Sequence, residues 1–408
     1  MDDFEIRLQL LLRYEPQPGE CGIIRSKSID RPAIQLPTEV WERVIDRLAE
    51  EYQYREYELW VYAQVCREWY PRCRFHARGS VVLDEKKQVY RLGEERRRRD
   101  AIRLVRIDEH VAVLGSFAAC MARRLPHAET LVLRSLEWVP GELHRHVFMH
   151  VGATFQSVAT LVLFEVGFPS VAVFGRLVCA LPRLSSLMCW ALDFRTSGFI
   201  AGSVRMPKRC ALTRLVLGYS PDVVDLFVLT SIGTGLQRLA LYDCDPEQRD
   251  AYQILLSTAG PSLSSIIIDL GAGVRDWKDL PLDFNSAVNL QTLCLNVDAN
   301  GLVRHSAWLL AVLSATPRSK LSEIRVASYE RIPGQTSLAE LFRALDGLHC
   351  TQIDHLLSGS QSPALRAVVF EFLVPIHLED IEKVPSEQVW REHLVSWFPK
   401  MHARGILR

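Results

Sequence analysis

The stretch that decides the fold is Leu236-Gln-Arg-Leu239-Ala-Leu241-Tyr-Asp-Cys244. It places aliphatic residues in the order L-x-x-L-x-L and ends in a cysteine three positions later. Looser copies recur along the chain, with second anchors at Leu131, Leu161, Leu187, Leu215, Leu239, Ile266, Leu293, Ile324 and Val368. Successive anchors lie 24 to 31 residues apart, except for a last gap of 44 residues that holds an insertion around 335–362. A regular period of this length predicts a stack of similar units.

Helical patterns lie between these copies, at 171–180, 222–229, 251–256, 306–314 and 338–356. A strand followed by a helix, repeated, predicts an α/β fold with parallel strands. One unit cannot bury its own apolar face, so we expect a leucine-rich-repeat solenoid over 111–375, with strands inside and helices outside. The period agrees with the roughly 20–29 residues of such repeats. An ordinary doubly wound α/β sheet is the alternative.

The remaining segments predict flanking units. The turn-rich break at 15–20 predicts that residues 1–33 form a leader, which need not be ordered. Residues 34–78 predict a helical unit: Pro37 suits a first helical turn, an apolar stripe follows to Leu48, and a second helix is expected to end at Pro71. Residues 79–110 predict a linking strand, helix and strand, with the helix at 86–98. Residues 376–408 predict a C-terminal helical cap, which a solenoid requires.

The helical unit resembles an F-box. Ile34-Gln-Leu-Pro-Thr-Glu-Val-Trp-Glu-Arg-Val-Ile-Asp-Arg-Leu48 is similar to its first half, and Ala63-Gln-Val-Cys-Arg-Glu-Trp69 to its second, while a charged insert at 53–58 departs from the family pattern. The resemblance implies a substrate-recognition subunit of an SCF (Skp-cullin-F-box) ubiquitin ligase, which docks a Skp-type adaptor and through it a cullin. The adaptor-binding positions that it implies are Leu36, Pro37, Val40, Ile45, Val65, Cys66 and Trp69.

A second surface follows from strand alternation. The residue between the two anchors of each strand, and the residue two positions later, point away from the anchors. The first of these rows is mostly aliphatic, and the second contains Phe164, Trp190 and Tyr242. Exposed aromatic residues are typical binding anchors, so these three are candidate contacts for an unknown substrate protein. The alternative is that loops or the C-terminal segment cover this face.

Composition narrows the class of protein. Lysine plus arginine equals aspartate plus glutamate, at 48 each, which argues against nucleic acid or a membrane surface as partner. None of the ten cysteines forms a C-x-x-C pair, which favours reduced thiols and a cytoplasmic or nuclear location. The start of the chain does not resemble a signal peptide, and no apolar run approaches the roughly 20 residues of a membrane helix, so we expect a soluble protein.

Motifs for catalysis, cofactors or metals are weak. G-x-S-x-G, H-E-x-x-H and G-x-x-x-x-G-K-[ST] do not occur, and the glycine pairs at 233–235 and 271–273 lack the third glycine of a dinucleotide site. His144, His146 and His150 cluster without a completing ligand set, and the arginines at 96–99 are flanked by acids. We therefore expect a non-catalytic protein without cofactor or metal. A repeat scaffold that acts without a ligase is the alternative function, and an enzyme built on an α/β sheet is the remote one.

Overall fold

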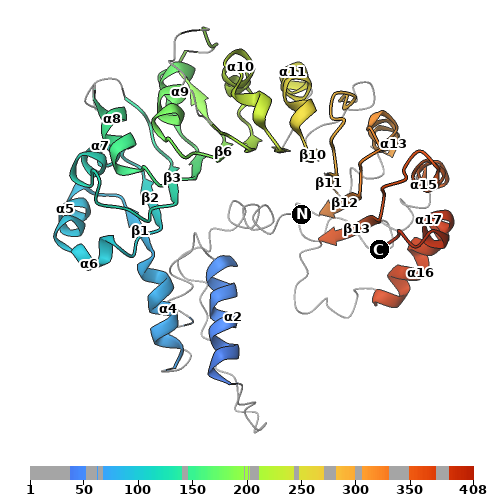
Figure 1. The fold of residues 1–408 in the computed structure, drawn as a ribbon, viewed down its shortest axis with the longest axis horizontal. Helices are drawn as coiled ribbons and strands as arrows, with labels where there is room; N and C mark the ends of the chain where they lie inside the picture. The colour runs from blue at the N-terminus through green and yellow to red at the C-terminus, as the bar shows by residue number, and fades with distance from the viewer. Residues whose placement is uncertain are drawn as a thin grey trace.

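A computed structural model describes residues 37–51, 62, 68–139, 146–196, 198–200, 202, 211–242, 248–270, 282–298, 306–329, 349–373 and 386–408. The chain forms an open arc with strands along its inner side and helices along its outer side, and two further helices, α2 and α4, extend from its N-terminal end (Figure 1). The predicted leader, residues 1–33, lies outside the described residues.

The main element is a parallel sheet of 11 strands. Its strands are β1 (Ser80–Leu83), β2 (Leu104–Asp108), β3 (Thr130–Arg134), β4 (Thr160–Phe164), β6 (Ser186–Trp190), β8 (Arg214–Gly218), β9 (Arg238–Tyr242), β10 (Ser265–Leu270), β11 (Thr292–Asp298), β12 (Glu323–Tyr329) and β13 (Ala367–Leu373). They lie side by side in chain order throughout, whereas a doubly wound sheet reverses its strand order partway. The short strands β5 (Gly167–Phe168) and β7 (Asp193–Phe194) form a separate parallel pair.

The predicted anchors all fall in one register. Leu131 pairs with Leu161, and the same row continues across every later strand to Val368. The parallel α/β fold is therefore confirmed. Val81 and Val105 extend this row at its N-terminal side, because β1 pairs with β2 and β2 with β3. The two strands expected in the linking segment 79–110 are thus the first two strands of the sheet.

Helices occupy the outer side of the arc, which is consistent with their positions between the strands (Figure 1). The predicted helix at 171–180 is α9 (Val171–Ala180), and the expected helix at 86–98 is divided at Glu95 into α5 (Lys86–Glu94) and α6 (Arg96–Arg99). The others are α7 (Val111–Cys120), α8 (Val147–Thr154), η1 (Pro221–Val223), α10 (Val224–Leu229), η2 (Ile232–Gly235), α11 (Arg249–Ala259), η4 (Gly260–Ser262), α13 (Ser306–Ala315) and α15 (Cys350–Ser358). Residues 338–348 of the last predicted helix lie outside the described residues.

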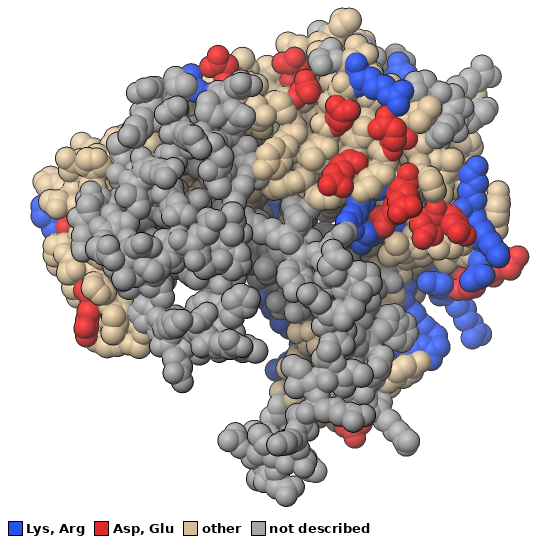
Figure 2. Space-filling view, turned by 180° about the vertical axis from the view of Figure 1, so that it is seen from behind, with Lys and Arg blue, Asp and Glu red and all other residues tan. Residues whose placement is uncertain are grey.

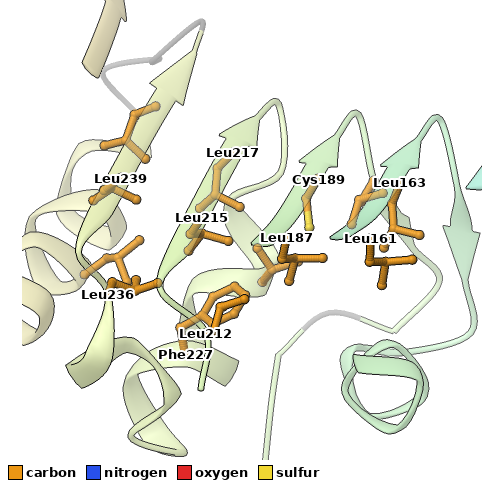
Figure 3. Packing of buried hydrophobic residues seen from close by; sticks show 14 of the residues in the cluster. Leu161, Leu163, Leu187, Cys189, Leu212, Leu215, Leu217, Phe227, Leu236 and Leu239 are labelled. Atoms are coloured by element: carbon orange, nitrogen blue, oxygen red, sulfur yellow. The ribbon is translucent and has the colours of Figure 1, made fainter. Parts of the chain in front are cut away.

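The core fills the space between the strands and the outer helices. Figure 3 shows anchor side chains of neighbouring strands, among them Leu161, Leu187, Leu215 and Leu239, directed to the same side of the sheet. Each of these four leucines is no more than 1% exposed. Because successive units repeat the same inward positions, their side chains form one continuous apolar cluster from Val81 to Ile406.

Backbone hydrogen bonds connect each unit to the next at the start of its strand, and the units from β2 to β8 are also connected at the carboxyl ends of their strands. The amides of Glu129 and Thr130 both donate to the carbonyl of Arg103, and the amides at the start of each following strand repeat this arrangement as far as Ala367. At the carboxyl ends, Ser135 and Glu165 have positive φ angles of 50° and 53°, and their amides donate to the last carbonyl of the neighbouring strand. The left-handed conformation strains a non-glycine residue, and here it turns the amide toward the next unit.

The C-terminal segment covers the last unit. Asp354, which is 2% exposed, accepts hydrogen bonds from the amides of Lys400 and Met401 at the start of α17 (Pro399–Ala403). α16 (Glu387–Trp397) precedes it, with Ser386 as its N-cap. Beyond α17, Leu407 forms a parallel bridge with Val368 of β13. The C-terminal residues thus take up part of the edge of the sheet.

Within the described ranges, no helix combines the length and apolar character needed to cross a membrane.

Candidate protein-binding surfaces

Helix α2 (Thr38–Glu51) has two apolar faces of different exposure. Ile45 is buried, at 1% exposure, and Trp41 is half-buried on the same side. Val40 and Val44 are 38% and 36% exposed, and with Pro37, also exposed, they follow helical spacing. We refer to Pro37, Val40 and Val44 as the α2 ledge. An apolar strip left open on a helix is a typical contact surface for another protein.

Helix α4 (Trp69–Arg78) packs against α2 through one of its sides. Cys73 is fully buried with Ile45, and the Trp69 ring lies 4.9 Å from that of Trp41. The expectation that a helix ends at Pro71 was wrong, because α4 runs through this residue. Pro71 stands in the first turn of α4, where a missing N–H leaves no intrahelical hydrogen bond unmade.

An ionic cluster also connects the two helices. The Arg72 guanidinium donates two hydrogen bonds of 2.6 Å to the carboxylate of Asp46, and His76 Nε2 lies 2.7 Å from the same carboxylate. The bonds from Arg72, followed by those from His76, lower the pKa of Asp46 from 3.8 to about 2, against an opposing effect of burial. The cluster fixes how α4 lies on α2, so it positions the α2 ledge.

The residues implied for adaptor binding therefore divide into three groups. Pro37 and Val40 are exposed on the α2 ledge, where a partner can reach them. Ile45 is buried inside the helix pair and Trp69 is half-buried against Trp41, so both hold the unit together. Leu36, Val65 and Cys66 lie outside the described residues. Val44 was missing from the predicted set, although its spacing of four residues from Val40 indicates the same face.

The second candidate surface is a row of aromatic residues along the carboxyl ends of the strands. Arg134, Phe164 and Trp190 are direct neighbours in register, and the row continues through Gly218 to Tyr242. The Arg134 guanidinium lies 5.7 Å from the centre of the Phe164 ring, a cation–π contact. The sequence thus identified side chains that the sheet does bring together.

The exposure of this row differs from the expectation. Phe164 and Trp190 are half-buried, but Tyr242 is 1% exposed and so does not present an open ring. The Trp190 ring lies across Gly218, where an added Cβ would be only 2.4 Å from it, and reaches within 5.7 Å of the Tyr242 ring. Tyr219, which was not predicted, is 46% exposed and contacts Trp190 edge to face. Its position directly after a strand gave no signal in the sequence.

The aliphatic row beside these aromatics is also buried. Val132, Val162, Met188, Val216, Ala240, Ile267 and Cys294 are each at most 6% exposed and form an apolar cluster separate from the main core. The one charged member, Arg325, is bound by Glu371 at 2.6 Å and by Glu323 at 2.8 Å. In the described part of the inner face, the aliphatic side chains pack against one another. The half-buried aromatic residues are the ones that a partner protein could contact.

Acidic residues flank the aromatic row. Glu109 and Glu165 directly follow β2 and β4, and in the view from behind, acidic side chains gather over the half of the molecule that carries the N-terminal strands (Figure 2). Burial, reinforced by the charges of Asp193 and Asp225, raises the pKa of Asp222. Acidic side chains therefore gather near the carboxyl edge of these strands, where Arg106 and Arg195 form ion pairs with Asp108 and Glu137.

Two further observations concern possible metal ligands and reactive thiols. No group of three or more His, Cys, Asp or Glu side chains within them could hold a metal ion. This includes His146 and His150, whereas His144 lies outside them. Burial raises the pKa of the Cys189 thiol, which keeps this cysteine protonated and unreactive.

Comparison with known proteins adds no family. A scan against protein-family models finds no match, and a search of curated proteins finds no significantly similar sequence.

Proposed function

We propose that the chain is an F-box protein with leucine-rich repeats, the non-catalytic substrate-recognition subunit of an SCF ubiquitin ligase. In this proposal the helix pair α2 and α4 docks a Skp-type adaptor, and the adaptor connects it to a cullin. The stacked units hold the target protein. A cytoplasmic or nuclear location follows from this role.

The α2 ledge is the observation that carries the proposal. Among the described residues, the buried cluster of the helix pair consists of Ile45 and Cys73, while Pro37, Val40 and Val44 remain open to solvent. Burying two partly exposed valines against a partner would recover apolar free energy at roughly 25 cal/mol per Å². The ledge begins at the Leu-Pro of the F-box-like sequence, so the exposed residues and the resemblance point to the same surface.

The repeated units support the second half of the proposal. Their anchors repeat at a near-constant period and share one register, and the amides of each unit donate to the one before it. Extended stacks of this kind serve as binding surfaces. The side chains proposed to contact the substrate are Phe164, Trp190 and the exposed Tyr219. The buried Tyr242 packs against the Trp190 ring.

The adaptor contact is tested by replacing apolar side chains of the α2 ledge with charged ones. Val40→Glu/Val44→Glu should weaken binding of a purified Skp-type adaptor at least about tenfold, because two carboxylates would be buried without partners. Val82→Glu, at a valine of β1 that is 39% exposed, introduces the same side chain elsewhere and should leave adaptor binding unchanged. Binding is measured by calorimetry on full-length chains. An adaptor that does not bind the wild type, or that binds the double variant equally well, would refute the proposal.

A cullin added to the same experiment separates the two candidate roles. If the chain and adaptor bind the cullin as a ternary complex, the ligase role stands. If the adaptor binds and the cullin does not join, the chain acts as a scaffold without a ligase. The triple variant Phe164→Ala/Trp190→Ala/Tyr219→Ala should lose substrate capture while retaining adaptor binding.

A further inference from the structure

A large groove lies at the junction of the helix pair and the sheet. It has a volume of about 1120 Å³ and runs between α4 and the amino ends of β1, β2 and β3. Pockets for small molecules occupy roughly 300–1,000 Å³, so this groove is wide enough for a peptide segment. Ala49 of α2 also lines it, but none of the residues of the α2 ledge does, so the groove is separate from that ledge.

The outer side of α4 lines the groove with aromatic rings. Tyr70 is 43% exposed and Phe75 is 61% exposed, and both border the groove. Large aromatic rings that are exposed to this extent are favourable contacts for an apolar side chain of a partner. Trp69 and Cys73 pack toward α2, and His76 contacts Asp46 of α2 at the border of the groove, so the rings of Tyr70 and Phe75 are the large side chains that α4 contributes to the groove.

Among the described residues that line the groove, arginines outnumber the acidic side chains. Arg74 and Arg78 stand one helical turn apart and both line the groove, and neither forms an ion pair with any described residue. Like charges at this spacing repel each other. Arg72, in contrast, is neutralised by Asp46. Arg103, also in the groove, lies 3.4 Å from Glu129, which leaves Asp100 as the remaining acid against two arginines.

A buried hydroxyl at the floor of the groove also lacks a partner. Ser80, the first residue of β1, is 8% exposed, and its Oγ forms no hydrogen bond in the described structure. Buried polar groups almost always have a hydrogen-bond partner. Ser80 lines the groove, so a side-chain movement that uncovers its Oγ would let a carboxylate or carbonyl oxygen of an occupant accept a hydrogen bond from it.

We propose that this groove binds an acidic peptide segment of a partner protein, with carboxylates or phosphates on Arg74 and Arg78 and an apolar side chain against Phe75. Arginine suits this role because its planar group binds both carboxylate and phosphate through two parallel hydrogen bonds. The inference rests on the groove itself and is independent of the ligase proposal.

The test uses full-length chains and short fluorescein-labelled peptides that alternate glutamate with phenylalanine and leucine. Matched peptides carry phosphoserine, glutamine or lysine in place of the glutamates. Fluorescence anisotropy at low and high salt should show that the wild type binds the glutamate or the phosphoserine peptide, with an affinity that falls as salt rises. Whichever of the two binds more tightly identifies the source of the anionic groups.

Arg74→Glu/Arg78→Glu should weaken that binding at least about tenfold, and Phe75→Ala should weaken it as well. Arg91→Glu/Arg97→Glu makes the same charge change at exposed residues outside the groove and should leave the affinity unchanged. Circular dichroism checks that each variant is folded. The proposal is overturned if neither anionic peptide binds at about 1 mM, if the glutamine or lysine peptide binds equally well, or if the groove variant binds like the wild type.

Discussion

The helix pair and the sheet bury their apolar residues to very different extents. In the sheet, one continuous cluster runs from Val81 to Ile406, so every described unit is packed against a neighbour or against the C-terminal segment. Among the described residues of the helix pair, the buried cluster consists of Ile45 and Cys73, supported by an ionic cluster and by half-buried rings. The described core of the helix pair is much smaller than that of the sheet, so we expect the helix pair to be the less stable of the two regions.

The largest expected effect is in the sheet. Phe227 of α10 is completely buried, so Phe227→Ala should lower the free energy of unfolding by about 3–5 kcal/mol. Urea denaturation followed by circular dichroism measures this change. Phe75→Ala, at a ring of the helix pair that is 61% exposed, is the matched control and should change it by no more than about 0.5 kcal/mol. Equal effects of the two substitutions would contradict the division between the regions.

A smaller and more local effect is expected inside the helix pair. Ile45→Ala should lower the local stability of α2 and α4 by about 2–3 kcal/mol while the urea midpoint of the sheet stays unchanged. Hydrogen exchange, followed by mass spectrometry of peptides from each region, distinguishes the two. Val44→Ala, one residue away and 36% exposed, should have little effect in the absence of a partner. If Ile45→Ala loosens the sheet equally, the two regions unfold as one.

The smallest effect concerns the ionic cluster. The pKa of Asp46 in the folded chain, about 2, lies below its ordinary value of 3.8. Its contribution to stability is therefore complete above about pH 4 and is lost as the pH falls through 2. Because the carboxylate is one-third exposed, solvent screening reduces this contribution to about 1 kcal/mol.

Asp46→Asn should thus accelerate hydrogen exchange in α2 and α4 about fivefold at pH 7, after correction for intrinsic rates. At pH 2 and below the variant and the wild type should become alike. Asp250→Asn removes a carboxylate that is 90% exposed and serves as the control. A difference between Asp46→Asn and wild type that persists unchanged at pH 2 would mean that the ionised carboxylate is not its source.

The same contrast explains what the sequence could predict. The anchors from Leu131 to Val368 were assigned correctly, because a buried strand position tolerates little but aliphatic residues and the period repeats. β1 and β2 were described as a link, although Ile102, Val105 and Ile107 already fit the aliphatic pattern. Pro71 was misread as the end of a helix because the sequence does not show whether proline begins a helix or ends one.

The candidate surfaces were harder to predict than the fold. Strand alternation brought Phe164, Trp190 and Tyr242 to one face, but it cannot tell how far a neighbouring side chain covers each ring. Tyr242 is buried beside Trp190, whose ring fits there because residue 218 is a glycine without a side chain. Trp190 and Gly218 are 28 positions apart in the sequence, so a local pattern does not show this contact. The groove at α4 depends on how the helix pair meets the sheet, which no local pattern encodes.

The backbone bonds at the strand starts have a consequence for how such a chain can change over time. At every step from Gly79 to Ala367, a backbone carbonyl of one unit accepts hydrogen bonds from two amides of the next unit. A whole unit can therefore be duplicated or deleted while the same hydrogen bonds form again on either side, whereas the loss of a single residue within a strand would move the side chains that follow it to the wrong face. The length of the arc is in this sense adjustable only in whole modules, and extra residues are admitted between strands, as in the long segment before β13.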